Sequence, residues 1–148
     1  MHGEKVRSFR GRKRGAVIAT ALLALSGIIG FSQPAAAAAP ADCDRGLACF
    51  WSGYNYDVDW WQLPGRLYFS YCVDDFRDYW VDDVASSVYN NGVRDGLFMA
   101  ADLWGTGKIK YVSRGSGYAN LSSIGWNDTV TSAHFESYRA SARTGRCE

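Results

Sequence analysis

The chain has 148 residues, 16 of them basic and 15 acidic, and aromatic residues make up 15%. Six of the basic residues and one acidic residue lie in positions 1–41, so residues 42–148 have ten basic and fourteen acidic groups and a net charge of −4. That balance argues against a nucleic-acid partner, because phosphate binding needs a basic face. The length that remains after position 41 is that of a single domain.

The N-terminal segment, residues 1–41, has the pattern of a secretory signal peptide. A basic run at 5–14 precedes an apolar stretch at 16–31 and a run of small residues at 35–41. The apolar stretch is short for a membrane span, and no later segment is long enough. We therefore expect a secreted, extracellular protein with no membrane span after cleavage.

All four cysteines, Cys43, Cys49, Cys72 and Cys147, lie in the exported part. An even count in an oxidising compartment predicts two disulfides. Three connectivities are possible, and in one of them Cys43 pairs with Cys49 while Cys72 pairs with Cys147. The alternative of a zinc site is weak, because no close cysteine pair or Cys/His cluster occurs.

Strand patterns dominate the rest of the chain. Ile109 and Tyr111 alternate with Lys108 and Lys110, and residues 133–138 alternate in the same way, which is the two-residue period of half-buried strands. Frequent glycines and asparagines separate these segments. We expect strands at 48–52, 60–63, 87–90, 97–101, 108–112 and 132–138.

One six-residue pattern occurs twice: two acidic or amide residues, two spacers, a hydroxyl residue and a serine. Motif one is Asp-Asp-Val-Ala-Ser-Ser at 82–87, and motif two is Asn-Asp-Thr-Val-Thr-Ser at 127–132. Hard cations take oxygen ligands from carboxylates, carbonyls and small hydroxyls, and each motif supplies all three. Such side chains also cap loops. Capping does not require equal spacing in both halves, so we expect two calcium sites.

The two halves repeat one order of elements: strand, turn, strand, irregular stretch, motif and strand. This is an internal duplication of about 45 residues. Each unit can form one Greek key, at about 47–92 and about 96–138, and two such units would pack into a sandwich. The expected fold class is all-β, with two Greek-key motifs in a single domain over residues 42–148.

These features resemble the βγ-crystallin superfamily. The resemblance lies in the two motifs, the strand-turn-strand opening and the early Cys49-Phe50-Trp51, and it covers essentially all of 42–148. Within the superfamily the chain is similar to peptidase inhibitor family thirty-six, of the Streptomyces metalloproteinase inhibitor type. The resemblance implies a non-enzymatic protein, expected to be a monomer, with two calcium ions and an extracellular metallopeptidase as partner.

The resemblance also implies the calcium ligands. The second motif residue would offer a carboxylate, the third its carbonyl and the fifth its hydroxyl, while the first organises the loop. In motif one, the first, second, third and fifth residues are Asp82, Asp83, Val84 and Ser86. In motif two, they are Asn127, Asp128, Thr129 and Thr131. The superfamily usually has a glycine in the opening turn, which Gly107 satisfies, whereas the first half has Val58, a poor residue for a positive φ.

The inhibitory loop of the family lies in the second Greek key and is closed by a disulfide. No cysteine occurs between Cys72 and Cys147, so this chain cannot build that loop in the same way. The pair Cys72 and Val73 would suit a rigid, disulfide-held loop in the first half, and we include both in the candidate binding surface.

Two other functions compete with inhibition. An enzyme is disfavoured, because His134 is the only histidine after residue 41 and no free cysteine is expected. Clustered aspartates at 74–83 can serve glycoside hydrolysis, but an acidic loop beside a cation site accounts for them. The second alternative is a carbohydrate- or cell-envelope-binding module, or a killer-toxin-like one. Trp60 and Trp61 would face opposite sides of a strand and expose one ring.

Overall fold

The structure is a computed structural model that describes residues 38–61, 65–142, 144 and 147. The chain divides into two units, Met1–Gln33 and Pro34–Glu148, and every described residue belongs to the second. The predicted signal peptide therefore lies outside the described residues, apart from positions 38–41. Nowhere in the described part does a helix combine the length and the apolar character needed to cross a membrane.

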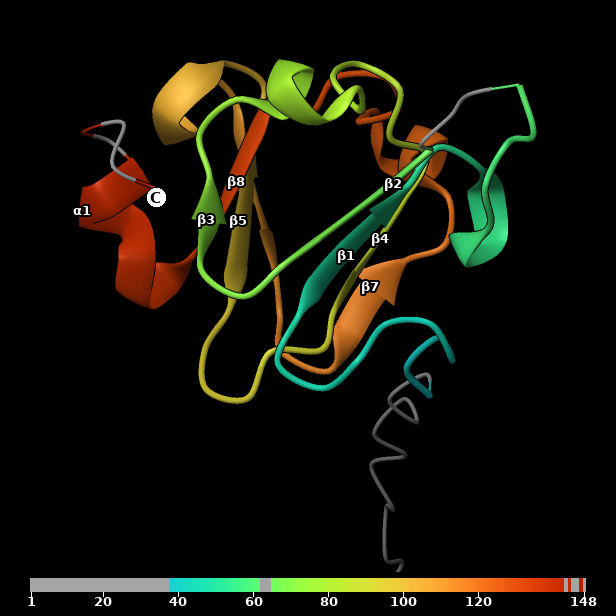
Figure 1. Ribbon diagram of the computed structural model, residues 1–148, viewed down its shortest axis with the longest axis horizontal. Coiled ribbons are helices and arrows are strands. Elements are labelled where there is room, and N and C mark those ends of the chain that lie inside the picture. Colours follow the sequence, from blue (N-terminus) through green and yellow to red (C-terminus); the bar gives the residue numbers. More distant parts are fainter. Residues whose placement is uncertain (1–37, 62–64, 143, 145–146, 148) are drawn as a thin grey trace, which may run out of the picture. The chain divides into compact units, whose positions relative to one another are not determined.

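Two four-stranded sheets form the fold (Figure 1). Sheet A has the strand order β2-β1-β4-β7, sheet B has the order β3-β8-β5-β6, and all neighbouring strands in both are antiparallel. The strands are β1 Ala48–Trp51, β2 Arg66–Phe69, β3 Cys72–Val73, β4 Ser87–Asn90, β5 Leu97–Ala100, β6 Ile109–Val112, β7 Ser116–Tyr118 and β8 Ser132–Phe135. The expected all-β class with two packed Greek keys is confirmed.

Short helical turns connect the strands. They are η1 Tyr54–Tyr56, η2 Phe76–Tyr79, η3 Leu103–Gly105, η4 Leu121–Ile124, η5 Glu136–Tyr138 and α1 Arg139–Ala142. The order strand, 3-10 turn, strand, strand, 3-10 turn, strand therefore occurs twice, from β1 to β4 and from β5 to β8. The motifs and the turns η2 and η3 lie at the upper end of the sheets in Figure 1.

The two halves exchange one strand each. The strand β3 of the first half pairs with β8, where Cys72 lies opposite His134, and β7 of the second half pairs with β4, where Gly117 lies opposite Tyr89. A β-carbon at Gly117 would collide with the backbone of β4, so only glycine fits this approach. Each sheet therefore contains strands from both halves, and neither sheet is complete without the other half of the sequence.

The core lies between the sheets and is rich in aromatic side chains. Phe50 packs edge-on against Phe76 at 5.1 Å between ring centres and stacks with Phe69. A second cluster covers the outer face of sheet A, where Trp51 and Tyr89 pack beside the Cys43–Cys49 disulfide. Both faces of β1 are therefore buried.

The disulfides join Cys43 to Cys49 and Cys72 to Cys147, which is one of the three connectivities that the sequence allows. The first closes a short loop before β1. The second links β3 to the C-terminal end of the chain, across a sequence separation of 75 residues. The longer bridge holds together two segments that are far apart in sequence.

Some strand predictions are wrong. Residues 60 and 61 form a turn, and the second strand begins only at Arg66. The short strands β3 and β7 were not predicted. The last strand ends at Phe135, where η5 begins, and does not continue to 138.

Left-handed backbone conformations occur at matching places in the two halves. The pairs are Asp83 and Asp128, both with φ 50, and Asn55 and Trp104, both with φ 56. Trp80 has φ 60. A residue other than glycine, asparagine or aspartate pays about 1–2 kcal/mol for this conformation. Val58 is not among the residues with positive φ, so the β-branched side chain in the first turn causes no strain.

Candidate functional site

Each motif leads directly into a central strand, because its last serine is the first residue of β4 or β8. Both serines are fully buried. Ser87 Oγ donates to the carbonyl of Gly53 at 2.7 Å, and Ser132 Oγ donates to the carbonyl of Asp102 at 2.5 Å. These carbonyls belong to the residues that precede η1 and η3. The sixth motif position thus ties each motif to the opening turn of its own half.

The two motifs also lie against each other. The N–H of Asp83 donates to the carbonyl of Val130 at 3.4 Å, and the N–H of Asp128 donates to the carbonyl of Ala85 at 3.2 Å. The chain turns sharply at both aspartates, since both have left-handed backbone. Aspartate tolerates this conformation because its short polar side chain can bond locally. This reciprocal pairing brings residues of the two motifs to one place.

A cavity of about 460 Å³ lies where motif one meets the turn of η3. Asp82 and Asp83 line it, together with Thr131 of motif two and Asp102. The carboxylates of motif one therefore meet the fifth residue of motif two, whereas Ser86 of their own motif is not in this lining. A cation here would be bound by both halves of the chain.

Charge and burial at the motifs suit a bound cation. Burial raises the pKa of Asp83, and the nearby charges of Asp82 and Asp128 raise it further. Asp82 Oδ1 and Asn127 Oδ1 are buried and have no hydrogen-bond partner in the described part of the chain. Both atoms belong to the first residue of a motif. A buried oxygen without a partner is costly, and a hard divalent ion would satisfy it.

The other predicted ligands fit the same kind of ion. Val84 is half-buried against the core, and Ser86 is buried. Thr129 Oγ1 donates to the carbonyl of Asn127 at 2.9 Å, and Asn127 Nδ2 donates to Asp128 Oδ2 at 2.6 Å. Among the residues described, no three His, Cys, Asp or Glu side chains converge as a metal-binding group. Calcium sites in proteins combine carbonyl and hydroxyl oxygens with carboxylates.

Asp102 is a cavity residue that the sequence analysis missed. It precedes η3, and its carboxylate lies so close to Gly107 that a β-carbon there would collide with it. Gly107 also has a positive φ of 73. Gly107 in the opening turn could therefore have indicated Asp102, since a residue without a β-carbon leaves space for the Asp102 side chain across the turn.

The acidic segment before motif one serves the scaffold. Asp75 Oδ1 accepts the N–H of Arg77 at 2.9 Å at the start of η2, and the two side chains form an ion pair at 2.7 Å. The Arg77 guanidinium lowers the pKa of Asp75. In the second half, Asn120 Oδ1 accepts the N–H of Ser122 in the same way. Asp75 is thus a helix cap that is ion-paired with Arg77.

His134 is buried in β8, where its ring stacks on Phe98 at 5.5 Å between ring centres. Neither ring nitrogen has a hydrogen-bond partner among the residues that the structure describes. Burial lowers the pKa of His134 to about 4, and the charge of Arg139 lowers it in the same direction. A histidine without a hydroxyl or carboxylate partner forms no Ser-His-Asp arrangement.

The predicted binding surface divides into an exposed part and a buried part. Trp60 and Trp61 are 81% and 62% exposed, with ring centres 5.3 Å apart and nearly perpendicular planes. Both rings reach solvent because the segment is a turn, so the expectation of a strand with one exposed ring is wrong. Cys72 and Val73 are buried in β3, which pairs with β8. Their assignment to an exposed loop is therefore corrected.

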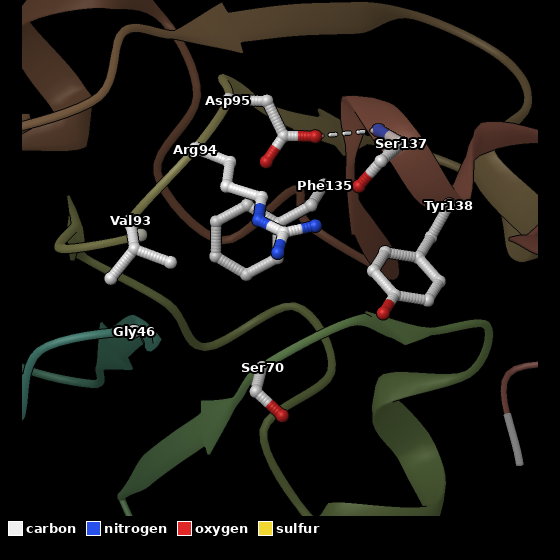
Figure 2. A pocket seen from close by; sticks show the side chains of 9 residues that line it. Gly46, Ser70, Val93, Arg94, Asp95, Phe135, Ser137 and Tyr138 are labelled. Atoms are coloured by element: carbon white, nitrogen blue, oxygen red, sulfur yellow. Dashed lines mark hydrogen bonds between the residues drawn. The ribbon is translucent and has the colours of Figure 1, made fainter.

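A second cavity, of about 310 Å³, lies at the opposite ends of the strands, where β4 and β8 finish (Figure 2). Figure 2 shows the side chains of Arg94 and Phe135 among those that line it, and Asp95 Oδ2 accepts the N–H of Ser137 at 2.7 Å. None of the residues predicted as site residues lines this cavity.

The arrangement of two interlocked Greek keys defines a βγ-crystallin fold. The chain is similar to a solved structure that concerns the evolution of the eye lens βγ-crystallin domain fold, at 23% identity and a TM-score of 0.53, over 62% of this chain and 85% of that chain. It is also similar to a βγ-crystallin from Ciona intestinalis, at 18% identity and a TM-score of 0.50, over 62% of this chain and 100% of that chain. A comparison with curated proteins finds no match.

The family is identified from the sequence match. The model of peptidase inhibitor family I36 matches residues 36–112, which is more than half of the chain. The protein therefore belongs to this peptidase inhibitor family, as the resemblance implied. The matched region includes motif one and ends at the last residue of β6.

Proposed function

We propose that this protein is a secreted, calcium-binding inhibitor of an extracellular metallopeptidase. Its membership of the peptidase inhibitor family carries the proposal. Export is supported by the leader pattern of residues 1–41 and by the two disulfides, because such bridges persist in oxidising compartments. Inhibition requires binding and not catalysis, in keeping with the scaffold roles of Asp75 and His134.

In this proposal, Trp60 and Trp61 contact the peptidase. In the second half, the opening turn is closed by the N–H of Ala101, which donates to the carbonyl of Lys108, seven positions later. In the first half, the N–H of Ser52 donates to the carbonyl of Gly65, thirteen positions later, so this turn is longer. The two tryptophans lie in the longer turn, which we call the extension. Aromatic side chains are enriched at the energetic centres of protein interfaces.

The base of the extension is anchored. Ser52 Oγ accepts the N–H of Asp59 at 3.0 Å, and the adjoining strands β1 and β2 are paired along their whole length. An anchored loop loses less conformational entropy on binding than a free one, so more of the contact energy appears as affinity.

Titration with the purified protein should therefore inhibit thermolysin, used as a representative metallopeptidase. Replacing both tryptophans, Trp60→Ala with Trp61→Ala, should weaken inhibition at least tenfold, because truncating a central aromatic residue costs about 2 kcal/mol or more. Residual hydrolysis of a chromogenic peptide measures the effect. Tyr111→Ala is the control, since Tyr111 is an exposed aromatic residue on β6, outside the first turn. Unchanged hydrolysis at a large molar excess of wild-type protein would remove the inhibitor assignment.

Calcium is the proposed ligand of the two motifs. The proposed set comprises Asp82, Asp83, Val84 and Ser86 of motif one, and Asn127, Asp128, Thr129 and Thr131 of motif two. The two unpartnered buried oxygens and the raised pKa of Asp83 support it. A bound divalent ion would neutralise the carboxylates that the fold brings together, and would link the two halves of the domain.

Calcium should raise the melting temperature of the mature protein. At a concentration one hundred times the dissociation constant, each site adds about 2.7 kcal/mol to the free energy of unfolding. Asp83→Ala with Asp128→Ala should abolish the rise. Each variant is compared with and without calcium, because alanine at a positive φ lowers stability by itself. Asp78→Ala, at an exposed aspartate of η2, should leave the rise intact. An equal rise in the double variant would contradict the assignment.

A further inference from the structure

Trp80 and Trp104 occupy left-handed positions that the other half of the chain gives to better suited residues. Trp80 follows η2 with φ 60 and ψ 30, and Gly125 follows η4 with φ 67 and ψ 38. Trp104 within η3 has φ 56 and ψ 35, and Asn55 within η1 has φ 56 and ψ 32. Glycine and asparagine adopt this conformation readily, and tryptophan does not. The fold needs a left-handed residue at both places, but it does not need an indole.

The backbone role of Trp80 requires no side chain. Its N–H donates to the carbonyls of Arg77 and Phe76, and the N–H of Gly125 makes the equivalent two bonds in the second half. The Trp80 side chain is 79% exposed, so burial contributes little to its retention. Strained residues that folding does not require are typical of functional surfaces.

The two indoles belong to neighbouring turns, and of the two Trp104 is the one that lines the motif cavity. Trp104 lines that cavity, and so does Arg77, which lies three positions before Trp80 in the turn of η2. The N–H of Trp104 donates to the carbonyl of Asp74 at 3.0 Å, which fixes η3 against the start of this turn. Within the described part of the chain, neither indole stacks on another aromatic ring. Trp104 is 50% exposed, so both rings are accessible to a ligand.

The lining of the cavity is polar. Carboxylates come from Asp82, Asp83 and Asp102, hydroxyls come from Thr106 and Thr131, and the guanidinium of Arg77 in this lining is paired with Asp75. The volume of about 460 Å³ lies in the range of small-molecule sites, which combine aromatic walls with a few polar groups. The centres of protein interfaces are depleted of charged residues, and acidic walls repel phosphates. A sugar ring suits both the aromatic wall and the polar groups of this cavity, because its C–H face packs on an indole while its hydroxyls bond to carboxylates.

We infer that Trp80 and Trp104 form a binding surface for a neutral, pyranose-containing glycan, with the polar groups of the motif cavity binding its hydroxyls. The surface is separate from the peptidase contact proposed at Trp60 and Trp61. With calcium bound at the motifs, Asp102 and Thr106 still offer polar groups to a glycan, because both line the cavity and neither is a proposed calcium ligand. The inference does not depend on peptidase inhibition.

The test measures binding of chitohexaose and cellohexaose to the mature protein by titration calorimetry. At least one of the two should bind, and Trp80→Gly should weaken that binding at least tenfold. Because this variant installs the residue of the second half, its melting temperature should be equal to or higher than that of the wild type. Trp104→Asn, designed on Asn55, should also weaken binding at least tenfold. Trp60→Ala should leave it unchanged.

Thermolysin inhibition is measured on the same proteins and separates the two proposals. Trp80→Gly should inhibit as well as the wild type does. The inference is overturned if neither oligosaccharide binds the wild type, or if Trp80→Gly binds with wild-type affinity. It is equally overturned if Trp80→Gly loses inhibition while its glycan affinity is unchanged, since the surface would then belong to a protein partner. If the wild type does not inhibit thermolysin, the glycan affinities alone decide the inference.

Discussion

Removing the long disulfide, by Cys72→Ala with Cys147→Ala, should lower the free energy of unfolding by about 4 kcal/mol. The bridge spans 75 residues, and an unfolded chain without it gains the conformational freedom of that whole loop. Cys72 also lies in β3, a two-residue strand at the edge of sheet B. Such a short strand has few bonds of its own, so the bridge is a large part of what holds it. Urea unfolding followed by tryptophan fluorescence measures the change.

The short disulfide provides the matched control. Cys43→Ala with Cys49→Ala removes a bridge that spans only six residues, and the same model gives a loss of about 2 kcal/mol. Cys43, Cys49 and Cys72 are buried and Cys147 is half-buried, so the short pair loses at least as much packing as the long pair. A greater loss from the short bridge than from the long one would contradict the loop-entropy explanation.

The strands that could be predicted are those with a pattern in their own residues. The segments β1, β4, β5, β6 and the beginning of β8 lie where the sequence predicts strands. The strands β3 and β7 were missed because they form through pairing with the other half. Cys72 and Val73 are held by β8, and β7 is held by β4 around Gly117. No local pattern reports a partner that is 26 or more residues away.

The alternation in β6 predicts the strand but not which face is buried. The apolar residues Ile109 and Tyr111 are exposed, and Val112 faces the core. Lys110, between them, is half-buried and places its ammonium group over the ring of Tyr118 at 5.5 Å. A lysine can cover apolar surface with its aliphatic stem while its charge meets an aromatic face. Polarity alone therefore assigns the wrong face to this strand.

The sequence predicts where the two motifs lie, but it does not predict how they meet. The repeated spacing identifies both motifs, and Ser87 and Ser132 have equivalent bonds in the two halves. The meeting of Asp82 and Asp83 with Thr131 follows from the reciprocal backbone bonds between the motifs. Those bonds join segments that are far apart in the sequence, so no local pattern reveals them.

Acid should destabilise the protein through His134. The pKa of this histidine is 6.5 in an unfolded chain and about 4 in the folded protein, where burial and then the charge of Arg139 disfavour the proton. The unfolded state therefore binds the proton at a higher pH than the folded state. Stability is fully present above pH 6.5 and declines as the pH falls to about 4. The total loss is about 3 kcal/mol, from 1.36 kcal/mol for each pKa unit.

The carboxylates with shifted pKa values change the free energy of unfolding in a different pH range or in the opposite direction. Asp42 and Asp75 have pKa values below the usual 3.8, because hydrogen bonds to Asp42 and the Arg77 partner of Asp75 favour their charged forms. Their contributions are lost only at still lower pH. The raised pKa of Asp83 has the opposite effect, since protonating it favours the folded state. Among the described groups with a shifted pKa, His134 is therefore the main source of the decline between pH 6.5 and 4.

Urea unfolding of the mature protein at pH 7.5, 5.5 and 4.0 measures this decline, and two variants identify its source. His134→Leu replaces a ring without hydrogen-bond partners by an apolar side chain, so its stability should change little between pH 7.5 and 4.0. Arg139→Gln removes the charge that opposes protonation, so the pKa of His134 should rise and the decline should become smaller than in the wild type. Both variants are compared with themselves across pH, which cancels any change in packing. An acid-induced loss of the same size in His134→Leu and in the wild type would show that this histidine is not the source.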